Sequence, residues 1–160
     1  MYKLLLVVMC LIWSEAISAD EWIQDELDCL AKNIYFEARG ESLTGKIAVA
    51  NVTMNRVNHP KYPSTVCGVV TQAKWYINWK GNRLPRRNQC QFSWFCDGKS
   101  DDPVDSATWL SSMHIARDVV QSKYGDITEG ATHYHATWVY PYWADSLNET
   151  VVINEHVFYK

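Results

Sequence analysis

The feature that most constrains the fold is a periodic apolar segment leading into a Glu-Ala-Arg-Gly-Glu run. Its apolar residues recur at helical spacing, at Leu27, Leu30, Ala31, Ile34, Tyr35 and Ala38. A helix with such a face must bury it, so the segment predicts an amphipathic helix against a core. Gly40 is a residue type that commonly ends helices in a left-handed conformation, and we expect the helix to stop there.

Glu37 falls in the last turn of this predicted helix. The helix dipole disfavours negative charge at a C-terminal end, and two aromatic residues precede this carboxyl. We therefore expect a raised pKa for Glu37, which is what a general acid working near neutral pH needs. The alternative is a solvated surface on which Glu37 and Glu41 pair with Arg39 and Lys46.

The first 19 residues are typical of a secretory signal peptide. Lys3 precedes an apolar run, and small residues follow it up to Ala19. The run is too short to span a bilayer comfortably, so we expect cleavage after Ala19 or Ala16. Residues 20–160 would then act in the periplasm, the cell wall or the medium. An uncleaved signal anchor is the alternative.

Composition argues against some partners and for others. The net charge of −3 predicts no basic surface for nucleic acid or an anionic membrane. Eight Trp and nine Tyr favour a carbohydrate ligand, because sugar rings stack on their faces. After cleavage, about 140 residues remain, enough for one domain. We expect a monomer without stable membrane association.

The predicted export changes how the cysteines are interpreted. With Cys10 in the leader, an even set remains in an oxidising compartment: Cys29, Cys67, Cys90 and Cys96. This predicts two disulfides. We favour Cys67 with Cys96 and Cys29 with Cys90, because a Cys90–Cys96 link closes a short loop and constrains little. A zinc site is the alternative, but no Cys-x-x-Cys pair is present, and we expect no metal or cofactor.

The rest of the chain predicts a compact, helix-rich α+β domain with a small sheet. Further helices are expected over 43–57, over 65–72 with Ser64 as N-cap, and from Asp105 or Ser106 to Lys123. Residues 73–105 lose helical periodicity and indicate a long functional loop, with a short strand between Cys90 and Cys96. Short strands are expected over 131–139, 150–153 and 156–159.

Two groups of polar residues allow more than one interpretation. Asn51, Asn55 and Arg56 share the second helix, where a capped and solvated face is one interpretation. His133 and His135 lie two residues apart, on one face of a predicted strand. That spacing can hold a metal, but no clear third ligand presents itself, so histidines lining a pocket are favoured.

Seven segments occur here in the order found in a known family. They are Tyr35–Glu41, Gly45–Ala50, Asn55–Val57, Thr65–Val70, Gln91–Trp94, Gly130–His135 and His156–Tyr159. In these segments the chain resembles the SleB-type cell-wall hydrolases, named for the spore cortex-lytic enzyme. The resemblance implies an α+β catalytic domain over residues 20–160, comparable in logic to lysozymes and lytic transglycosylases. It implies cleavage of the muramic acid to glucosamine bond in peptidoglycan glycan strands, with Glu37 as catalytic acid and Arg39 and Glu41 as a supporting pair.

A single catalytic acid favours a lytic transglycosylase. Glu37 would protonate the glycosidic oxygen and then accept a proton as the sugar's own 6-hydroxyl attacks, leaving an anhydro-muramic end. A muramidase-type hydrolase is the alternative and needs a second carboxylate, for which Glu41 and Asp97 are candidates. The expected substrate contacts are hydrogen bonds from Gln91, Ser93 and His133, ring faces of Trp94 and Tyr134, and His135 in the cleft wall.

Two other classes of function stay open. One is a metal-dependent amidase or peptidase that uses His133, His135 and a carboxylate, and a chelator would abolish its activity. The other is a non-catalytic wall-binding module, in which aromatic residues grip glycan and Glu37 is incidental. Binding to purified sacculi without release of soluble fragments would identify that module.

Overall fold

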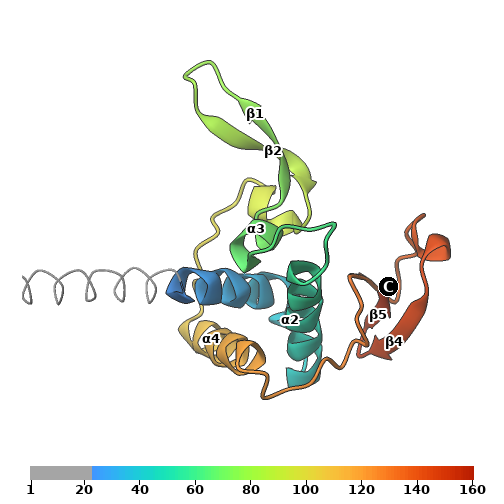
Figure 1. The fold of residues 1–160 in the computed structure, drawn as a ribbon. Helices are drawn as coiled ribbons and strands as arrows, with labels where there is room; N and C mark the ends of the chain where they lie inside the picture. Colours follow the sequence, from blue (N-terminus) through green and yellow to red (C-terminus); the bar gives the residue numbers. More distant parts are fainter. Residues whose placement is uncertain (1–22) are drawn as a thin grey trace, which may run out of the picture.

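The computed structural model describes residues 23–160, so the predicted leader lies outside the described residues. The predicted α+β class is confirmed (Figure 1). The chain is helical over residues 23–38, here called the N-terminal helix, and then forms α2 (Leu43–Val57), α3 (Val66–Val70) and α4 (Ser106–Val120). Two short 3-10 helices, η1 (Ser93–Cys96) and η2 (Ala144–Ser146), complete the helical part. Within residues 23–160, none of the helices has the length and apolar character needed to cross a bilayer.

The strands form two antiparallel sheets. In the first, β1 (Ala73–Ile77) pairs with β2 (Arg83–Cys90). The second has the order β3-β5-β4, with β5 (His156–Tyr159) between β3 (His133–Ala136) and β4 (Glu149–Ile153). The strands predicted near the C-terminus are therefore confirmed.

Helix α2 joins the two halves of the core. One side of it packs with the predicted apolar face of the N-terminal helix, with α3 and with α4. Its other side places Ala48 and Val52 against Ala131, just before β3, and against Phe158 of β5. Because α2 is covered on both sides, its orientation is set by helices and sheet together.

The helix ends follow the capping rules with two differences. Ser42, Thr65 and Asp105 cap α2, α3 and α4, so the cap of α3 is one residue later than expected. The N-terminal helix ends at residue 38 as predicted, but Gly40 does not adopt the left-handed conformation. The Glu41 amide instead donates to the Ala38 carbonyl at 3.0 Å, and this tight turn leads directly into the cap of α2.

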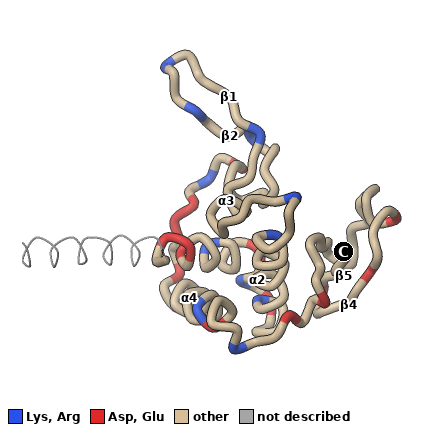
Figure 2. The backbone as a smooth tube through the Cα atoms, in the orientation of Figure 1, with Lys and Arg blue, Asp and Glu red and all other residues tan. Residues whose placement is uncertain are grey.

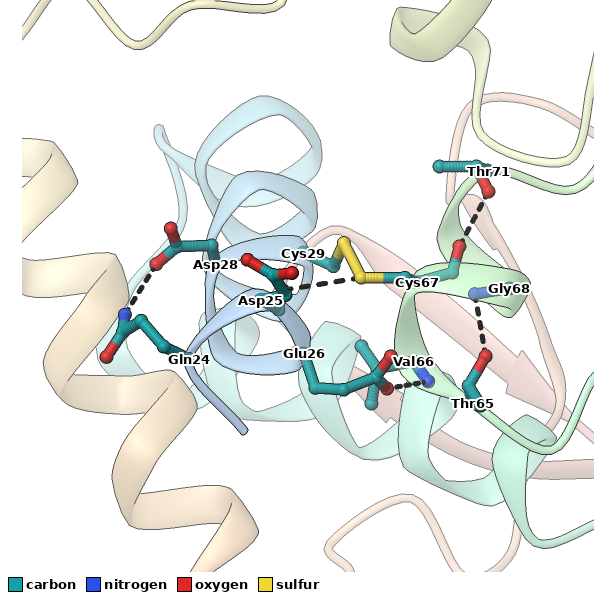
Figure 3. Close-up of a disulfide and its surroundings, with 10 residues drawn as sticks. All are labelled: Gln24, Asp25, Glu26, Asp28, Cys29, Thr65, Val66, Cys67, Gly68 and Thr71. Carbon is teal, nitrogen blue, oxygen red and sulfur yellow. Dashed lines mark hydrogen bonds between the residues drawn. A yellow bond between two sulfur atoms is a disulfide. The ribbon is translucent and has the colours of Figure 1, made fainter. Parts of the chain in front are cut away.

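The disulfide pairing favoured from the sequence is wrong. Cys29 is bonded to Cys67, and Cys90 is bonded to Cys96. The first bond ties the N-terminal helix to the start of α3, where the Glu26 carboxylate also accepts from the Val66 amide (Figure 3). The loop entropy of the unfolded chain, on which the favoured pairing depended, does not decide which cysteines meet in the folded chain.

The segment expected to be one long loop contains the β1-β2 hairpin. Trp75 lies opposite Pro85, and Ile77 lies opposite Arg83. Most of the hairpin residues are exposed, so they lack the alternation of apolar and polar residues that marks a half-buried strand. The strand expected between Cys90 and Cys96 is also wrong, because η1 occupies that position.

Candidate functional site

Glu37 lies where two hollows adjoin, and it is partly buried. One hollow, of about 280 Å³, is lined by Glu37, Arg56, Gln91, Phe92, Ser93, His133, Tyr134 and Trp143. The other, of about 380 Å³, is lined by Phe36, Glu37, Arg39, Ser93, Trp94, Asp97, Lys99 and Ser100. Because Glu37 and Ser93 line both, we treat the two as one site, called the Glu37 cleft.

The surroundings of the Glu37 carboxyl shift its pKa. Burial raises its pKa, while a hydrogen bond from Tyr134 and the positive charge of Arg56 act in the opposite direction. The Tyr134 hydroxyl donates to Glu37 Oε2 at 3.0 Å. The predicted direction is confirmed, with desolvation as the main cause. Burial and the neighbouring carboxyl raise the pKa of Tyr134 well above its ordinary value, so its hydroxyl remains a donor.

Arg56 is a cleft residue that the sequence analysis did not identify. Only 3% of it is exposed, so a solvated face is the wrong interpretation for this residue. Its Nε donates to the Thr132 carbonyl at 2.7 Å, and its guanidinium lies over the rings of Tyr62 and Phe92 at 5.4 and 5.1 Å. Its Nη1 is buried and has no hydrogen-bond partner among the described residues. A cation therefore lies in the same wall as the Glu37 carboxyl.

The asparagines beside Arg56 hold the chain that enters β3. Asn55 donates from Nδ2 to Asp126, Thr128 and the Ala131 carbonyl. Asn51 accepts from the amide of residue 127. The signal for this role was available in the sequence, since α2 is apolar on both sides and leaves its polar row little solvent to face. These bonds fix the start of β3 and with it the position of Tyr134.

Trp94 and Tyr134 make different contacts from those expected of free ring faces. Trp94 is 8% exposed, stacks on Phe36 with ring centroids 4.8 Å apart, and donates from Nε1 to Asn33 at 3.0 Å. Buried Asn33 in turn donates to Thr53, which connects η1 to two helices. The Tyr134 hydroxyl donates to Glu37, so the contact observed for this side chain is with that carboxyl group. A role for either ring in stacking on sugar stays a prediction.

The remaining predicted residues divide between the cleft and its surroundings. Gln91, Ser93 and His133 line the cleft. Burial and the charge of Arg56 lower the pKa of His133. His135 is not among the residues that line the two hollows, and its Nε2 lies 3.0 Å from the Tyr159 hydroxyl. Residues 23–160 contain no group of three or more side chains able to hold a metal, so the geometry adds no third ligand to the two histidines.

Arg39 and Glu41 occupy separate positions. Arg39 lines the larger hollow of the cleft. Glu41 accepts from Asn154 Nδ2 at 3.2 Å and lies 3.7 Å from His156 Nδ1, so it ties the end of the N-terminal helix to the β4-β5 turn. Within the described chain no ion pair joins the two residues, and a supporting role for them stays a prediction.

Replacing Tyr134 by Phe tests its contact with the acid. The hydrogen bond lowers the pKa of Glu37, so its loss should raise that pKa and keep the acid protonated to higher pH. The alkaline limb of the pH profile of kcat/KM should therefore move to higher pH. The maximal rate should fall roughly fivefold, as expected for one lost hydrogen bond. Tyr124→Phe removes a hydroxyl bonded to remote Asp118 and is the control. An unchanged pH profile for Tyr134→Phe would contradict the assigned contact.

Two spore cortex-lytic enzymes show local sequence similarity to this chain. The enzyme of Oceanobacillus iheyensis is 41% identical over 51 residues, which are 32% of this chain and 18% of that enzyme. The enzyme of Bacillus subtilis is 44% identical over 46 residues, which are 29% of this chain and 15% of that enzyme. The matched part therefore spans less than a fifth of the length of these relatives.

Solved structures and a family comparison cover much more of the chain. The catalytic domain of the germination-specific lytic transglycosylase SleB from Bacillus anthracis has a TM-score of 0.64 and 25% identity, covering 86% of this chain and 95% of that one. The catalytic domain of the Bacillus cereus SleB protein, with a TM-score of 0.58 and 23% identity, supports the fold and covers 86% of this chain and 91% of its own. The family match begins at residue 40, just after Glu37. Since that match extends over residues 40–159, the chain belongs to the Cell Wall Hydrolase family.

Proposed function

We propose that the chain cleaves the MurNAc-GlcNAc bond of peptidoglycan as a lytic transglycosylase with Glu37 as its single acid and base. The observation that carries this proposal is one carboxyl with a raised pKa, held by Tyr134 in the wall of an open cleft. The likeness to a domain described as a lytic transglycosylase supports the reaction class. The likeness to enzymes described as spore cortex-lytic supports a cell-wall substrate.

The proposed reaction needs one group in two protonation states. Neutral Glu37 gives its proton to the glycosidic oxygen as the bond from that oxygen to the sugar's anomeric carbon breaks. The resulting carboxylate accepts the proton of the 6-hydroxyl as that oxygen bonds to the same carbon, and Glu37 is neutral again. Burial favours the neutral form, while Tyr134 and Arg56 stabilise the carboxylate that exists between the two steps.

A muramidase using Asp97 is the second candidate, because Asp97 lines the same cleft as Glu37. A hydrolase needs such a second carboxylate to activate water or to attack the sugar. Asp97 Oδ1 accepts from the Lys99 amide at 2.8 Å, and Oδ2 lies 3.8 Å from Lys99 Nζ. Both oxygens of the Asp97 carboxylate therefore contact Lys99 in the same turn, which favours the transglycosylase.

Mass spectrometry of fragments released from purified sacculi distinguishes the candidates. We expect anhydro-muramic ends, and we expect Asp97→Asn to retain most of the activity. Reducing ends, together with a loss on the order of 10²–10⁴-fold in Asp97→Asn, would establish the hydrolase. Release of peptides from intact glycan would establish an amidase, and binding without release would establish a wall-binding module.

We further propose that the protein acts in the periplasm or outside the cell. The two disulfides support this location, because such bonds persist in oxidising compartments.

A further inference from the structure

The β1-β2 hairpin is an arm whose sequence differs from the rest of the chain. We call residues 73–90 the β-arm. It extends away from the helical core, with its loop as the most distant part of the hairpin (Figure 1). Its base is fixed, because Trp75 contacts Phe95 and the Cys90–Cys96 disulfide closes the chain directly after β2.

All charged residues of the β-arm are positive. It contains Lys74, Lys80, Arg83, Arg86 and Arg87 and no Asp or Glu, although the whole chain has a net charge of −3. Figure 2 shows these positive positions along the arm and the acidic residues in other parts of the molecule. The expectation that no basic surface exists is therefore wrong for this part, because net charge averages over regions of opposite sign.

The end of the β-arm also exposes apolar side chains. Trp79 is 89% exposed and Ile77 is 63% exposed, and Tyr76 and Leu84 are exposed beside them. Cations lie over the aromatic rings, with Lys80 over Trp79 at 4.9 Å, Arg83 over Trp75 at 4.3 Å and Arg86 over Tyr76 at 5.8 Å. Exposed apolar groups gathered at one projecting end indicate an interaction site.

We propose that the β-arm docks on an anionic lipid bilayer, with Trp79 and Ile77 in the interface and the arm's cations against the headgroups. Trp and Tyr favour the headgroup region of bilayers, and Lys and Arg are attracted to anionic lipid surfaces. A glycan or a nucleic acid explains the cations and rings but not the aliphatic side chains. Transfer of Ile77 and Leu84 from water to an apolar phase lowers the free energy, and a bilayer provides such a phase.

Docking would also orient the Glu37 cleft. Strand β2 ends at Cys90 and leads directly to Gln91 and Ser93 in the cleft wall. The disulfide to Cys96 ties this junction to η1. The β-arm would thus hold the cleft at a set distance from the bilayer. This inference concerns binding and does not depend on which reaction Glu37 performs.

Vesicle sedimentation tests the role of the cations. The disulfide-bonded protein, residues 20–160, is mixed with phosphatidylglycerol-phosphatidylcholine vesicles or with pure phosphatidylcholine vesicles, at low and high salt. We expect binding to the anionic vesicles that weakens as salt rises. Combining Lys80→Gln, Arg83→Gln and Arg86→Gln should reduce partitioning on the order of 100-fold, because each cation contributes roughly fivefold. The matched control removes three exposed cations outside the β-arm, Lys61, Arg117 and Lys123, and should bind nearly as the parent does.

A second pair of variants tests the apolar end. Trp79→Ser should weaken vesicle binding roughly tenfold or more, because it removes the largest exposed apolar side chain of the β-arm. Tyr142→Ser is the control, since Tyr142 is 94% exposed but lies outside the arm. Circular dichroism and intact disulfides establish that each variant is folded. Equal losses in arm and control variants would overturn the proposal. So would arm-dependent binding to purified sacculi or DNA with no binding to anionic vesicles.

Discussion

Glu37→Gln is expected to yield a folded protein that still binds sacculi but releases fragments 10²–10⁴-fold more slowly, the loss typical of a missing general acid. Gln keeps the shape of the side chain and can still accept the hydrogen bond from Tyr134, which is 3.0 Å long in the native protein. It removes the proton that Glu37 gives to the leaving group in the proposed mechanism. Fragment release from sacculi, measured per folded molecule, tests this expectation. A fully active variant would remove Glu37 from the mechanism.

The same variant should be at least as stable as the native protein near neutral pH. Because burial raises the pKa of Glu37 above its ordinary value of 4.5, the folded state favours the neutral carboxyl. That stabilisation is present below the ordinary value and is lost as pH rises through the raised pKa, whereas Gln stays neutral throughout. Urea unfolding should show the variant gaining stability relative to the native protein as pH rises. Glu41→Gln is the control for the fragment-release experiment. We expect it to act mainly through stability, because it loosens the contact with Asn154.

Arg56→Met is expected to lower the free energy of unfolding by about 2–4 kcal/mol. The Thr132 carbonyl loses a charge-assisted hydrogen bond, which is worth about 1.5–3 kcal/mol. The cation–π contacts of the desolvated guanidinium with Tyr62 and Phe92, worth up to about 2 kcal/mol, are lost as well. Removing the cost of burying the guanidinium offsets part of this loss. Urea unfolding measures the change. Arg117→Met removes an exposed cation on α4 and should change stability by no more than about 0.5 kcal/mol.

The pH dependence of this loss of stability tests whether Arg56 is an electrostatic partner of Glu37. Arg56 lowers the pKa of Glu37, so its removal raises that pKa and leaves the carboxylate without a nearby cation. The loss should therefore be larger at a pH above the raised pKa of Glu37, where the carboxylate forms, than at a pH below it. In a double-mutant cycle, Arg56→Met should cost less in the Glu37→Gln background, because that carboxylate is absent. Equal losses in both backgrounds and at both pH values would mean that Arg56 acts through packing alone.

Local periodicity predicted the elements whose apolar residues recur at helical or strand spacing and contact the core. The N-terminal helix, α2, α4 and the C-terminal strands all carry such a pattern, and each lies close to its expected position. Hairpin β1-β2 was missed because its strands have no buried face. Because most of these side chains are exposed, packing imposes no alternation of apolar and polar residues on the two strands.

The sequence by itself determined the α+β class, the helix that ends near Glu37 and the likeness to cell-wall hydrolases. Only the tertiary structure decided which groups surround the acid. Tyr134 is 97 residues from Glu37 in the chain, and Arg56 meets Thr132 across 76 residues. Spacing along a sequence describes neighbours on one helix or strand, whereas these contacts depend on how α2 packs between the helices and the sheet. The disulfide pairing was decided in the same way, because a bond forms only between cysteines that the fold brings together.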